Sequence, residues 1–586
     1  MTQNRAESAL RIRIDAAKAA HHRPHPRHVS NGDEERYSAA HYPMSFTKGL
    51  DHDFGLGLVA EKRHFEAFRN CIDEGWIEAF TARVPVPLSE DCARRKWEAP
   101  TAGTAYDLEG PDAQAVTMPP APALCSDELA FEMAEVYELA LLRDVPFQSF
   151  DQDGGPGDGQ IDDAIARLSA LPYAGAGFPS RPRMTAGGSL TRQTIFRGSA
   201  PGVEKGPYLS QFMWIGSGNQ AGSSGVADGV ITYGAQGIDQ RVLVAEPGDD
   251  YMQDWQSWYD VQQGFDVNKC SPGQNLSGKR RFICTPRDLA TYVHFDALYQ
   301  AYLNAALILL GMGTPFDSGI GKLSGMREMY NPLNQPTGTP QNTGGFALYG
   351  GPHILTLVTE VATRALKAVR FQKFNTHLRL RPEALAARME KAAEIDKTFP
   401  ALCGCFSEMR EQIGDTVKAV ESFNPTGTAL LPMAFAEGSP MHPTYGAGHA
   451  TVAGACVTIL KAFFDTGTVF GINADKGSCH AGQPGFYHDI ETPLFFAPGK
   501  GCETLEPHKI RCPLTLEGEL NKLAANISIG RNMAGVHYFS DYYDSLRMGE
   551  QIAIGMLEEQ AMCYPTDQVV FSLASFDGDC VRIGAR

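Results

Sequence analysis

Two histidines flank a loop of small residues, and this arrangement indicates a site for an anion. The segment His442-Pro-Thr-Tyr-Gly-Ala-Gly-His449 runs directly into an apolar stretch, Ala450–Phe464, that we predict to be helical. Glycine lets backbone amides approach a ligand, and a helix N-terminus adds unpaired N–H groups and partial positive charge. Histidine can transfer protons near neutral pH. The segment therefore predicts an oxyanion site with acid–base chemistry.

Two further segments carry the positive charge that such a site needs. In the first, Lys373 and Arg381 are eight residues apart, so a helix would present both on similar faces. In the second, Arg531 precedes His537, and Asp541 lies four residues further on, where a carboxylate can fix the tautomer of the imidazole. Burying three cations without an anion would cost roughly several kcal/mol per charge. The three segments together therefore predict a pocket for a dianion or trianion, rather than cations that separately reach solvent.

The overall charge makes a convergence of cations informative. The 586 residues include 51 Lys+Arg and 68 Asp+Glu, a formal net charge of −17, which argues against a nucleic-acid partner or an anionic membrane surface. No run of about 18 apolar residues suggests a membrane span. Residues 1–8 lack the apolar core of a secretory signal. We expect a cytoplasmic protein, export by another route, or a signal that has been removed.

Helical periodicity dominates the chain and indicates an all-α, bundle-like fold with long loops. Strand signals are few, with a short hairpin expected around Ile231–Ala245. We predict three regions: an N-terminal arm (1–45) that contacts other subunits, a helical region with long loops (46–290), and a helical region that carries the site (291–586). The expected helices are Ala6–Ala20, Ala60–Phe80, Asp127–Leu142, Ile161–Leu171, Tyr292–Leu310, His353–Phe371, one that starts near Pro382, Thr451–Phe464, Leu516–Ile529 and Tyr538–Gln560.

Three other features that resemble metal or thiol sites are assigned structural roles. The tract His21–His28 is interpreted as a solvated arm. The acidic loop Asp151–Asp163 is interpreted as a turn before a helix, because Pro156 and Asp162 occupy the places where a hand-type calcium loop needs Gly and Glu. Of the thirteen cysteines we expect most to be buried or free thiols, with one or two disulfides.

The order and spacing of the three segments resemble the vanadium-dependent haloperoxidases and the related phosphatidic-acid and bacterial acid phosphatases. The matching patterns are Lys-x₇-Arg-Pro, Gly-x-Gly-His and Arg-x₃-Gly-x-His-x₃-Asp. The contexts Pro443–Cys456 and Gly530–Asp541 most resemble the bromoperoxidases of red algae and cyanobacteria, over about residues 290–560. This resemblance implies two four-helix bundles, a vanadate cofactor, and a homo-oligomer ranging from a dimer to a dodecamer.

The resemblance also implies a role for each site residue. His537 is expected to be the only protein ligand of vanadium, and His449 the acid–base residue. His442 occupies the position of a second histidine in bromoperoxidases, which favours bromide and iodide over chloride. The expected contacts to the vanadate oxygens come from Lys373, Arg381, Arg531 and the amide of Gly448.

One position departs from the family pattern. Ala447 stands where the family usually has a serine whose hydroxyl would bond a vanadate oxygen. Losing that bond removes about 1.5–3 kcal/mol if the charged acceptor stays unpaired, so we expect vanadate to bind less tightly. A calcium ion of the kind found in red-algal relatives cannot be placed, because 331–345 contains no acidic residue.

The resemblance predicts oxidation of halide by hydrogen peroxide to hypohalous acid, which halogenates a small organic acceptor. His449 would accept a proton from hydrogen peroxide, and Lys373 would make a peroxide oxygen electrophilic. Two alternatives remain. A phosphatase would use the same pocket with His537 as nucleophile. A non-catalytic phosphate-binding or shell protein would have the pocket but no turnover, and Ala447 is the only feature that favours this second alternative.

Overall fold

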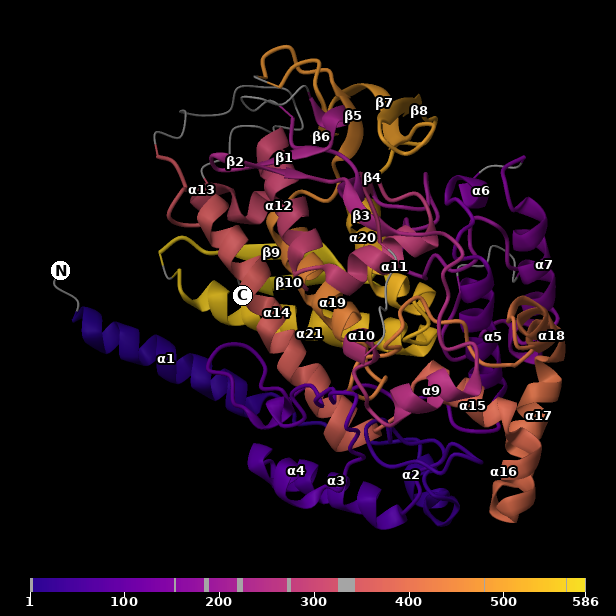
Figure 1. Cartoon of the computed structure of the whole chain (residues 1–586). Coiled ribbons are helices and arrows are strands. Elements are labelled where there is room, and N and C mark those ends of the chain that lie inside the picture. The colour runs from indigo at the N-terminus through magenta and orange to yellow at the C-terminus, as the bar shows by residue number, and fades with distance from the viewer. Residues whose placement is uncertain are drawn as a thin grey trace.

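Helices are the main regular structure in the part of the chain that the structure describes. The computed structural model describes residues 4–584 except 152–153, 184–188, 219–224, 271–275, 325–342, 479 and 565. Within this part the helices gather in two groups and the strands form small sheets (Figure 1). The predicted helical, bundle-like class is confirmed.

A single apolar helix organises the C-terminal group. In α19 (Gly448–Phe463) every residue after the first two is buried, as expected for a helix packed on all sides. It packs against α14 (Gly351–Phe371), α20 (Leu516–Met533) and α21 (Phe539–Met562), and α12 (Gln300–Met312) contacts α14 and α19. Helices α14, α19, α20 and α21 lie close to the ranges predicted from the sequence, whereas the single helix predicted over Tyr292–Leu310 is broken into the end of α11 (Pro286–Phe295) and α12, with a bend of 99° between them. The oxyanion loop therefore ends on a helix that is buried on all sides.

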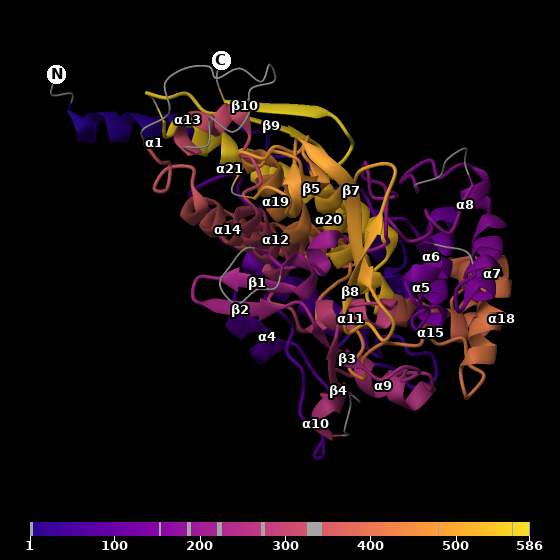
Figure 2. The same cartoon turned by 90° about the horizontal axis from the view of Figure 1, so that it is seen from above.

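The second group lies beside the first in both views (Figures 1 and 2). It contains α5 (Asp127–Leu141), α7 (Asp158–Ser169), α15 (Pro382–Glu390), α17 (Cys405–Gln412) and α18 (Gly414–Phe423), with α5 in contact with α7, α15 and α18. Helix α5 also contacts α20 and α21, so it joins the two groups. The remaining helices are α2 (Asp33–Arg36), α3 (Lys62–Glu74), α4 (Ile77–Arg83), α6 (Gln148–Asp151), α8 (Pro172–Gly175), α9 (Trp255–Gln262), α10 (Val267–Cys270), α11 (Pro286–Phe295), α13 (Gly321–Ser324) and α16 (Ala392–Thr398).

The sheets are antiparallel and short. The predicted hairpin is confirmed as β1 (Val230–Tyr233) and β2 (Gln236–Asp239), while β3 (Val242–Ala245) pairs with β4 (Leu276–Arg281). A four-stranded sheet between α19 and α20 was not anticipated, because its strands are interrupted by Gly, Pro and charged residues. Its strands, in the order β6-β5-β7-β8, are β5 (Val469–Asn473), β6 (Pro484–Tyr487), β7 (Ile490–Pro498) and β8 (Leu505–Lys509). A separate pair near the C-terminus consists of β9 (Val570–Ala574) and β10 (Cys580–Gly584).

The N-terminal arm begins with an exposed helix. Helix α1 (Arg5–His22) has no buried residue and projects from the body in both views (Figures 1 and 2). The end of the histidine tract is packed, since the His28 ring contacts Thr117 Oγ1 at 3.0 Å and the Gln114 carbonyl at 3.2 Å. The solvated arm is thus confirmed for α1, but not for His28.

The segment that carries Lys373 and Arg381 is not a continuous helix. Helix α14 ends at Phe371 and is followed by a π-helical turn, Gln372–His377. Leu378 then takes a left-handed backbone conformation with φ +40°, and Arg381 is extended with φ −81° and ψ 157°. The idea that both cations share one helix face is therefore wrong. The break instead turns the chain so that both side chains enter the site from different directions.

The other expected sites are occupied by structural contacts. In the acidic loop, Asp151 pairs with Arg197, and Asp158 and Asp162 pair with Arg192, so these carboxylates do not converge on a metal. Among the described residues no group of three or more His, Cys, Asp or Glu side chains is arranged to hold a metal ion. The segment 331–345 lies largely outside the described residues.

The described cysteines divide between disulfides and free thiols. Two disulfides join Cys125 to Cys405 and Cys284 to Cys502, and the bond of Cys92 makes a third, so the expectation of one or two was too low. Six described cysteines are free: Cys71, Cys403, Cys456, Cys512, Cys563 and Cys580.

No single described helix is both long and apolar enough to cross a membrane. Helices α11 and α12 together have the length and the apolar composition of a membrane span, but they are bent by 99° relative to each other.

Candidate active site

Lys373 and Arg381 meet at the loop that precedes α19. The Lys373 Nζ donates to the carbonyls of Pro443 at 2.5 Å and Thr444 at 3.0 Å. Arg381 donates through Nε to the carbonyl of His442 at 2.9 Å and through Nη1 to that of Val536 at 2.7 Å. Both side chains are almost fully buried. Two cations are thus held by neutral backbone oxygens at one point in the fold.

His537 is fixed so that one ring nitrogen, Nε2, carries no proton and faces the cation Arg381. Its Nδ1 lies 2.8 Å from Asp541 Oδ2 and 3.1 Å from Thr444 Oγ1, and Thr444 also donates to Asp541. A carboxylate accepts only, so Nδ1 carries the proton and Nε2 keeps its lone pair. Arg381 Nη1 donates to that Nε2 at 3.1 Å. Burial, followed by the charge of Arg381, holds the pKa of His537 well below its usual range, so the ring is neutral.

The oxyanion loop ends where the amides of α19 begin. Ala447 is the N-cap residue and has no side-chain group to cap the helix, while its own N–H donates to Ser545 Oγ at 2.8 Å. Gly448 is the first helical residue, and a Cβ placed there would approach only Leu366 Cδ2, at 3.9 Å. The surroundings of the Gly448 Cα are therefore open, and its amide belongs to the first turn of α19, where N–H groups have no partner within the helix.

His449 enters the site from the first turn of α19. Its Nε2 lies 3.0 Å from Asp296 Oδ1, and its side chain is 17% exposed. In the neutral ring the proton on Nε2 points to Asp296, so Nδ1 keeps a lone pair that can accept a proton.

Arg531 completes the set of cations and is not fully bonded. Its Nη1 donates to the carbonyl of Val293 at 3.0 Å. Its Nε is buried and has no hydrogen-bond partner within the described residues. This N–H is therefore available to an acceptor that is not part of the chain.

The electrostatics of the three cations favour an anion. None of Lys373, Arg381 and Arg531 forms an ion pair with a carboxylate of the described chain within 4.0 Å. Burial is the largest cause that lowers the pKa of each, to about 9 for Arg381 and well below the usual value for Lys373. Buried cations without countercharge are unfavourable. The donors present therefore fit a tetrahedral oxyanion such as vanadate.

His442 lies at the edge of this cluster beside a fourth cation. Arg381 Nη2 donates to its Nδ1 at 2.7 Å, so its Nε2 carries the proton and lies 3.4 Å from Glu98 Oε2. Arg370 Nη2 is also 3.4 Å from Glu98, and Arg370 Nη1 is buried without a partner within the described residues. Burial, then Arg370 and Lys373, holds the pKa of His442 well below its usual range.

All eight residues selected from the sequence come together at this site. They are Lys373, Arg381, His442, Ala447, Gly448, His449, Arg531 and His537. Sequence reasoning missed Asp296, Thr444 and Arg370. Asp296 lies 153 positions from His449 and belongs to no pattern with it. Thr444 stood inside the quoted loop, and a hydroxyl beside a histidine ligand was the signal that could have identified it.

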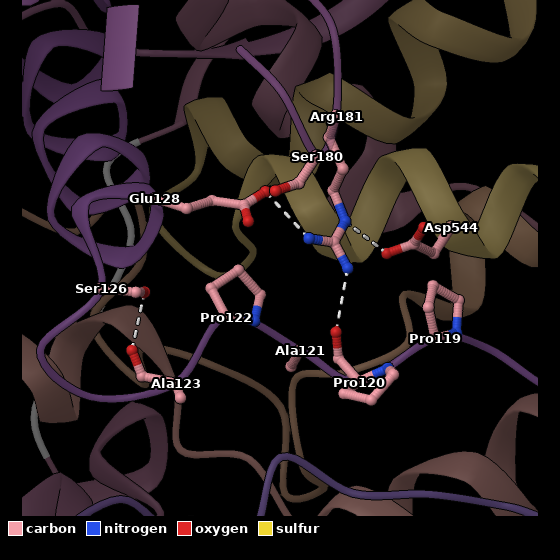
Figure 3. A pocket seen from close by; sticks show the side chains of 10 residues that line it. All are labelled: Pro119, Pro120, Ala121, Pro122, Ala123, Ser126, Glu128, Ser180, Arg181 and Asp544. Atoms are coloured by element: carbon pink, nitrogen blue, oxygen red, sulfur yellow. Dashed lines mark hydrogen bonds and ion pairs between the residues drawn. The ribbon is translucent and has the colours of Figure 1, made fainter. Parts of the chain in front are cut away.

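A separate cavity lies on the other side of the loop. It has a volume of about 360 Å³ and is lined by Pro119–Ala123, Glu128, Arg181 and Asp544, among others (Figure 3). Arg181 is engaged by Asp544 at 2.6 Å, Glu128 at 2.8 Å and the carbonyl of Pro120 at 3.0 Å. Tyr445 joins this cavity to the loop, since its hydroxyl donates to Asp544 at 2.7 Å. With its cation already paired, the cavity does not fit an oxyanion.

Comparison with known proteins decides the family. Over 99% of both chains, the sequence is 42% identical to a vanadium-dependent bromoperoxidase of Corallina pilulifera and 41% identical to that of Corallina officinalis. The chain belongs to the vanadium-dependent bromoperoxidases. A relative from Ascophyllum nodosum, with the same name, is 30% identical over 95% of this chain and 88% of its own length.

The family assignment agrees with the domain match and the fold. Residues 414–564 match the model of the VCPO second helical-bundle domain. The homohexameric structure of the second vanadate-dependent bromoperoxidase of Ascophyllum nodosum superposes with a TM-score of 0.75 and 25% identity, covering 99% of this chain and 90% of that one. The resemblance stated from three short segments is thereby confirmed along almost the whole chain.

Proposed function

We propose that this bromoperoxidase uses vanadate and hydrogen peroxide to oxidise bromide, and iodide, to hypohalous acid that halogenates organic acceptors. The balanced reaction consumes hydrogen peroxide, bromide and one proton and yields hypobromous acid and water. One observation carries the proposal: three cations that are buried and have no carboxylate partner among the described residues meet at the oxyanion loop, and one of them, Arg381, lies 3.1 Å from the unprotonated Nε2 of His537.

One residue would bind the metal of the cofactor, and several others would bind its oxygens. His537 would bind vanadium through Nε2, because Asp541 and Thr444 already occupy Nδ1. Arg381, Arg531 and Lys373 would neutralise the vanadate oxygens, with the Gly448 amide as a further donor. Two of the three hydrogens of the Lys373 ammonium go to backbone carbonyls, which leaves the third for an oxygen in the site. When bound, vanadate supplies a Lewis-acidic centre that activates hydrogen peroxide without a change of oxidation state.

His449 is the proton carrier of this site. Its Nδ1 lone pair would take the proton that hydrogen peroxide gives up, and the Asp296 carboxylate would stabilise the imidazolium that forms. Lys373 would polarise the oxygen that the halide attacks, since a buried ammonium acts strongly in a site of low dielectric.

The choice of bromide and iodide rests on the family resemblance at His442. Its ring is buried, neutral and bonded to Arg381, so it shapes the cationic cluster without adding charge. The phosphatase alternative uses the same oxyanion pocket, but the relatives along the full length are bromoperoxidases.

We further infer that the protein is a homo-oligomer. The structural neighbour is a homohexamer, and α1 of this chain projects with Leu10 57% and Ile14 43% exposed. Light scattering of the purified protein measures the subunit number, for which the sequence resemblance gave a range from two to twelve. Calcium analysis of the same sample tests whether that ion is present.

One assay separates the candidate functions. Apoprotein supplied with vanadate, bromide and hydrogen peroxide should brominate a phenol dye, and omission of vanadate should abolish the reaction. A phosphatase would instead hydrolyse p-nitrophenyl phosphate and be inhibited by vanadate, and a binding protein would do neither. In the same assay we expect His449→Ala to retain vanadate while kcat falls by about 10²–10⁴-fold. Unchanged bromination by this variant would remove His449 from the proton-transfer role.

A further inference from the structure

A segment near the N-terminus, residues 43–50, runs beside the residues that precede Arg381. Within it, Ser45 forms an antiparallel bridge with Arg379. The N–H of Leu380 donates to a carbonyl of the same segment at 3.1 Å. We call residues 43–50 the N-terminal strap. The strap therefore fixes the backbone that presents Arg381 to the site, although the two lie far apart in the sequence.

Lys48 connects the strap to the turn that leads into His442. Its Nζ donates to the carbonyl of Ser439 at 2.7 Å and to that of Glu437 at 3.1 Å. The same Nζ pairs with Glu383 Oε1 at 2.8 Å, so all three hydrogens of the ammonium are used. The other carboxylate oxygen of Glu383 accepts from the N–H of Ser439 at 2.7 Å. Lys48 and Glu383 thus hold the same turn from two sides.

The pair formed by Lys48 and Glu383 is not explained by stability alone. Their side chains are 2% and 1% exposed. Removing two charges from water costs free energy that their attraction offsets only in part, and an apolar pair of similar volume is often as stable. The location of the pair is more informative, because Glu383 lies two residues after Arg381 in the first turn of α15.

The charge of Glu383 acts on Arg381 without direct contact. Burial lowers the pKa of Arg381 to about 9, and Glu383 is the carboxylate that opposes this lowering most. A carboxylate so placed attracts the guanidinium and repels an anion bound to it. The ammonium of Lys48 cancels most of this charge. Without Lys48, Glu383 would therefore compete with the anion for Arg381.

We propose that Lys48 is a positioning residue of the active site: it neutralises Glu383, which leaves the charge of Arg381 to the bound anion, and it holds the turn before His442. The inference rests on the proposed function, which places an oxyanion beside Arg381. Lys48 itself does not touch the anion, because its three N–H groups are already engaged. It acts through Glu383 and through the turn.

The test is the affinity of the apoprotein for inorganic phosphate, measured by calorimetry at pH 7. Lys48→Met should weaken binding about tenfold, because it leaves the charge of Glu383 uncompensated. Adding Glu383→Gln to Lys48→Met removes that charge and should restore the affinity to within about threefold of the native value. A merely structural role predicts the opposite order, since the double variant loses more contacts than the single one.

A second buried ion pair provides the matched control. Lys522 pairs with Glu519 at 2.6 Å, and both side chains are 1% exposed. Lys522 lies nine residues before Arg531 on α20, which places it about 13 Å along the helix from the site. Lys522→Met should therefore change phosphate affinity by less than about twofold, although it breaks an equally buried pair.

Lys48→Gln is a second variant that keeps N–H donors but carries no charge, and it should also weaken binding about tenfold. Circular dichroism of each variant checks that it is folded. Unchanged affinity in Lys48→Met and Lys48→Gln, or a double variant as weak as Lys48→Met, would overturn the proposal. Failure of the proposed function is a different result, because phosphate binding is measured without bromide or hydrogen peroxide, whereas that failure is the absence of vanadate-dependent bromination by the native protein.

Discussion

Two groups of buried cations lie beside the oxyanion loop and differ in their partners. In the rear group, Arg181, Arg183 and Arg379 form ion pairs with carboxylates of α5 and α21 at 2.6–3.1 Å. In the front group, Lys373, Arg381 and Arg531 bond to backbone carbonyls and imidazoles. Both groups are deeply buried, so burial alone does not distinguish them.

Arg379 and Arg381 show the difference most clearly, because they are two residues apart. Burial lowers the pKa of both, but Glu132 and Asp541 more than offset this for Arg379, whose pKa is raised. For Arg381 burial prevails, and the pKa is lowered to about 9. Charge that is compensated within the chain stabilises the fold, whereas charge without a partner within the chain is available to bind a ligand.

The largest expected effect is the loss of stability when the rear group is broken. Arg379→Met would leave Glu132 and Asp541 buried without their cation, which should lower the free energy of unfolding by about 3–5 kcal/mol. Urea denaturation of the apoprotein measures this change. A loss below about 1 kcal/mol would mean that the rear pairs are not structural.

In the front group the same substitution should affect binding rather than folding. Arg381→Met removes a cation that has no internal countercharge, so stability of the apoprotein should fall by much less than in Arg379→Met. Vanadate affinity should drop by about 10- to 100-fold, as expected for a lost charged hydrogen bond. Equilibrium dialysis against vanadate measures the affinity. Equal destabilisation by the two substitutions would remove the distinction between the groups.

A smaller effect should follow from adding a donor to the front group. Ala447→Ser would place a hydroxyl at the N-cap of α19, where it can donate to an oxygen of the bound anion. We expect vanadate affinity to rise about tenfold. The matched control is Ala450→Ser, one turn inside the same helix, which should give no gain. Unchanged affinity in Ala447→Ser would show that the residue does not face the ligand.

The smallest expected effect is a pH dependence of anion affinity. Burial lowers the pKa of Lys373 well below its usual value, so its ammonium loses charge at a lower pH than an exposed lysine. Since phosphate stays a dianion between pH 8 and about pH 10, its affinity should fall several-fold over this range as Lys373 deprotonates. Calorimetry measures the trend. Lys373→Met should bind more weakly at pH 8 and show a flatter profile, and an equally steep profile would contradict this assignment.

The sequence predicted the front group better than the residues that support it. Local spacing was sufficient for His537 and Asp541, which are four residues apart on one turn, and for the glycine loop that begins α19. Asp296 could not be predicted, because its contact with His449 is created by the packing of α11 against α20. Helical spacing was misleading for Arg381, since a left-handed residue at Leu378 ends the helical turn.

The fold was likewise predicted where the sequence pattern is regular and missed where it is not. Helices with a continuous apolar face, such as α14 and α19, were predicted within a few residues. The sheet formed by β5–β8 was not, because Gly, Pro and charged residues interrupt the alternation that marks a strand.

The central claim is that the front group binds vanadate through His537. The most direct test is anomalous X-ray diffraction at the vanadium edge from crystals of vanadate-loaded protein. We predict one strong anomalous peak within bonding distance of His537 Nε2, with the side chains of Lys373, Arg381 and Arg531 around it. A vanadium peak elsewhere in the molecule, with this position empty, would contradict the account.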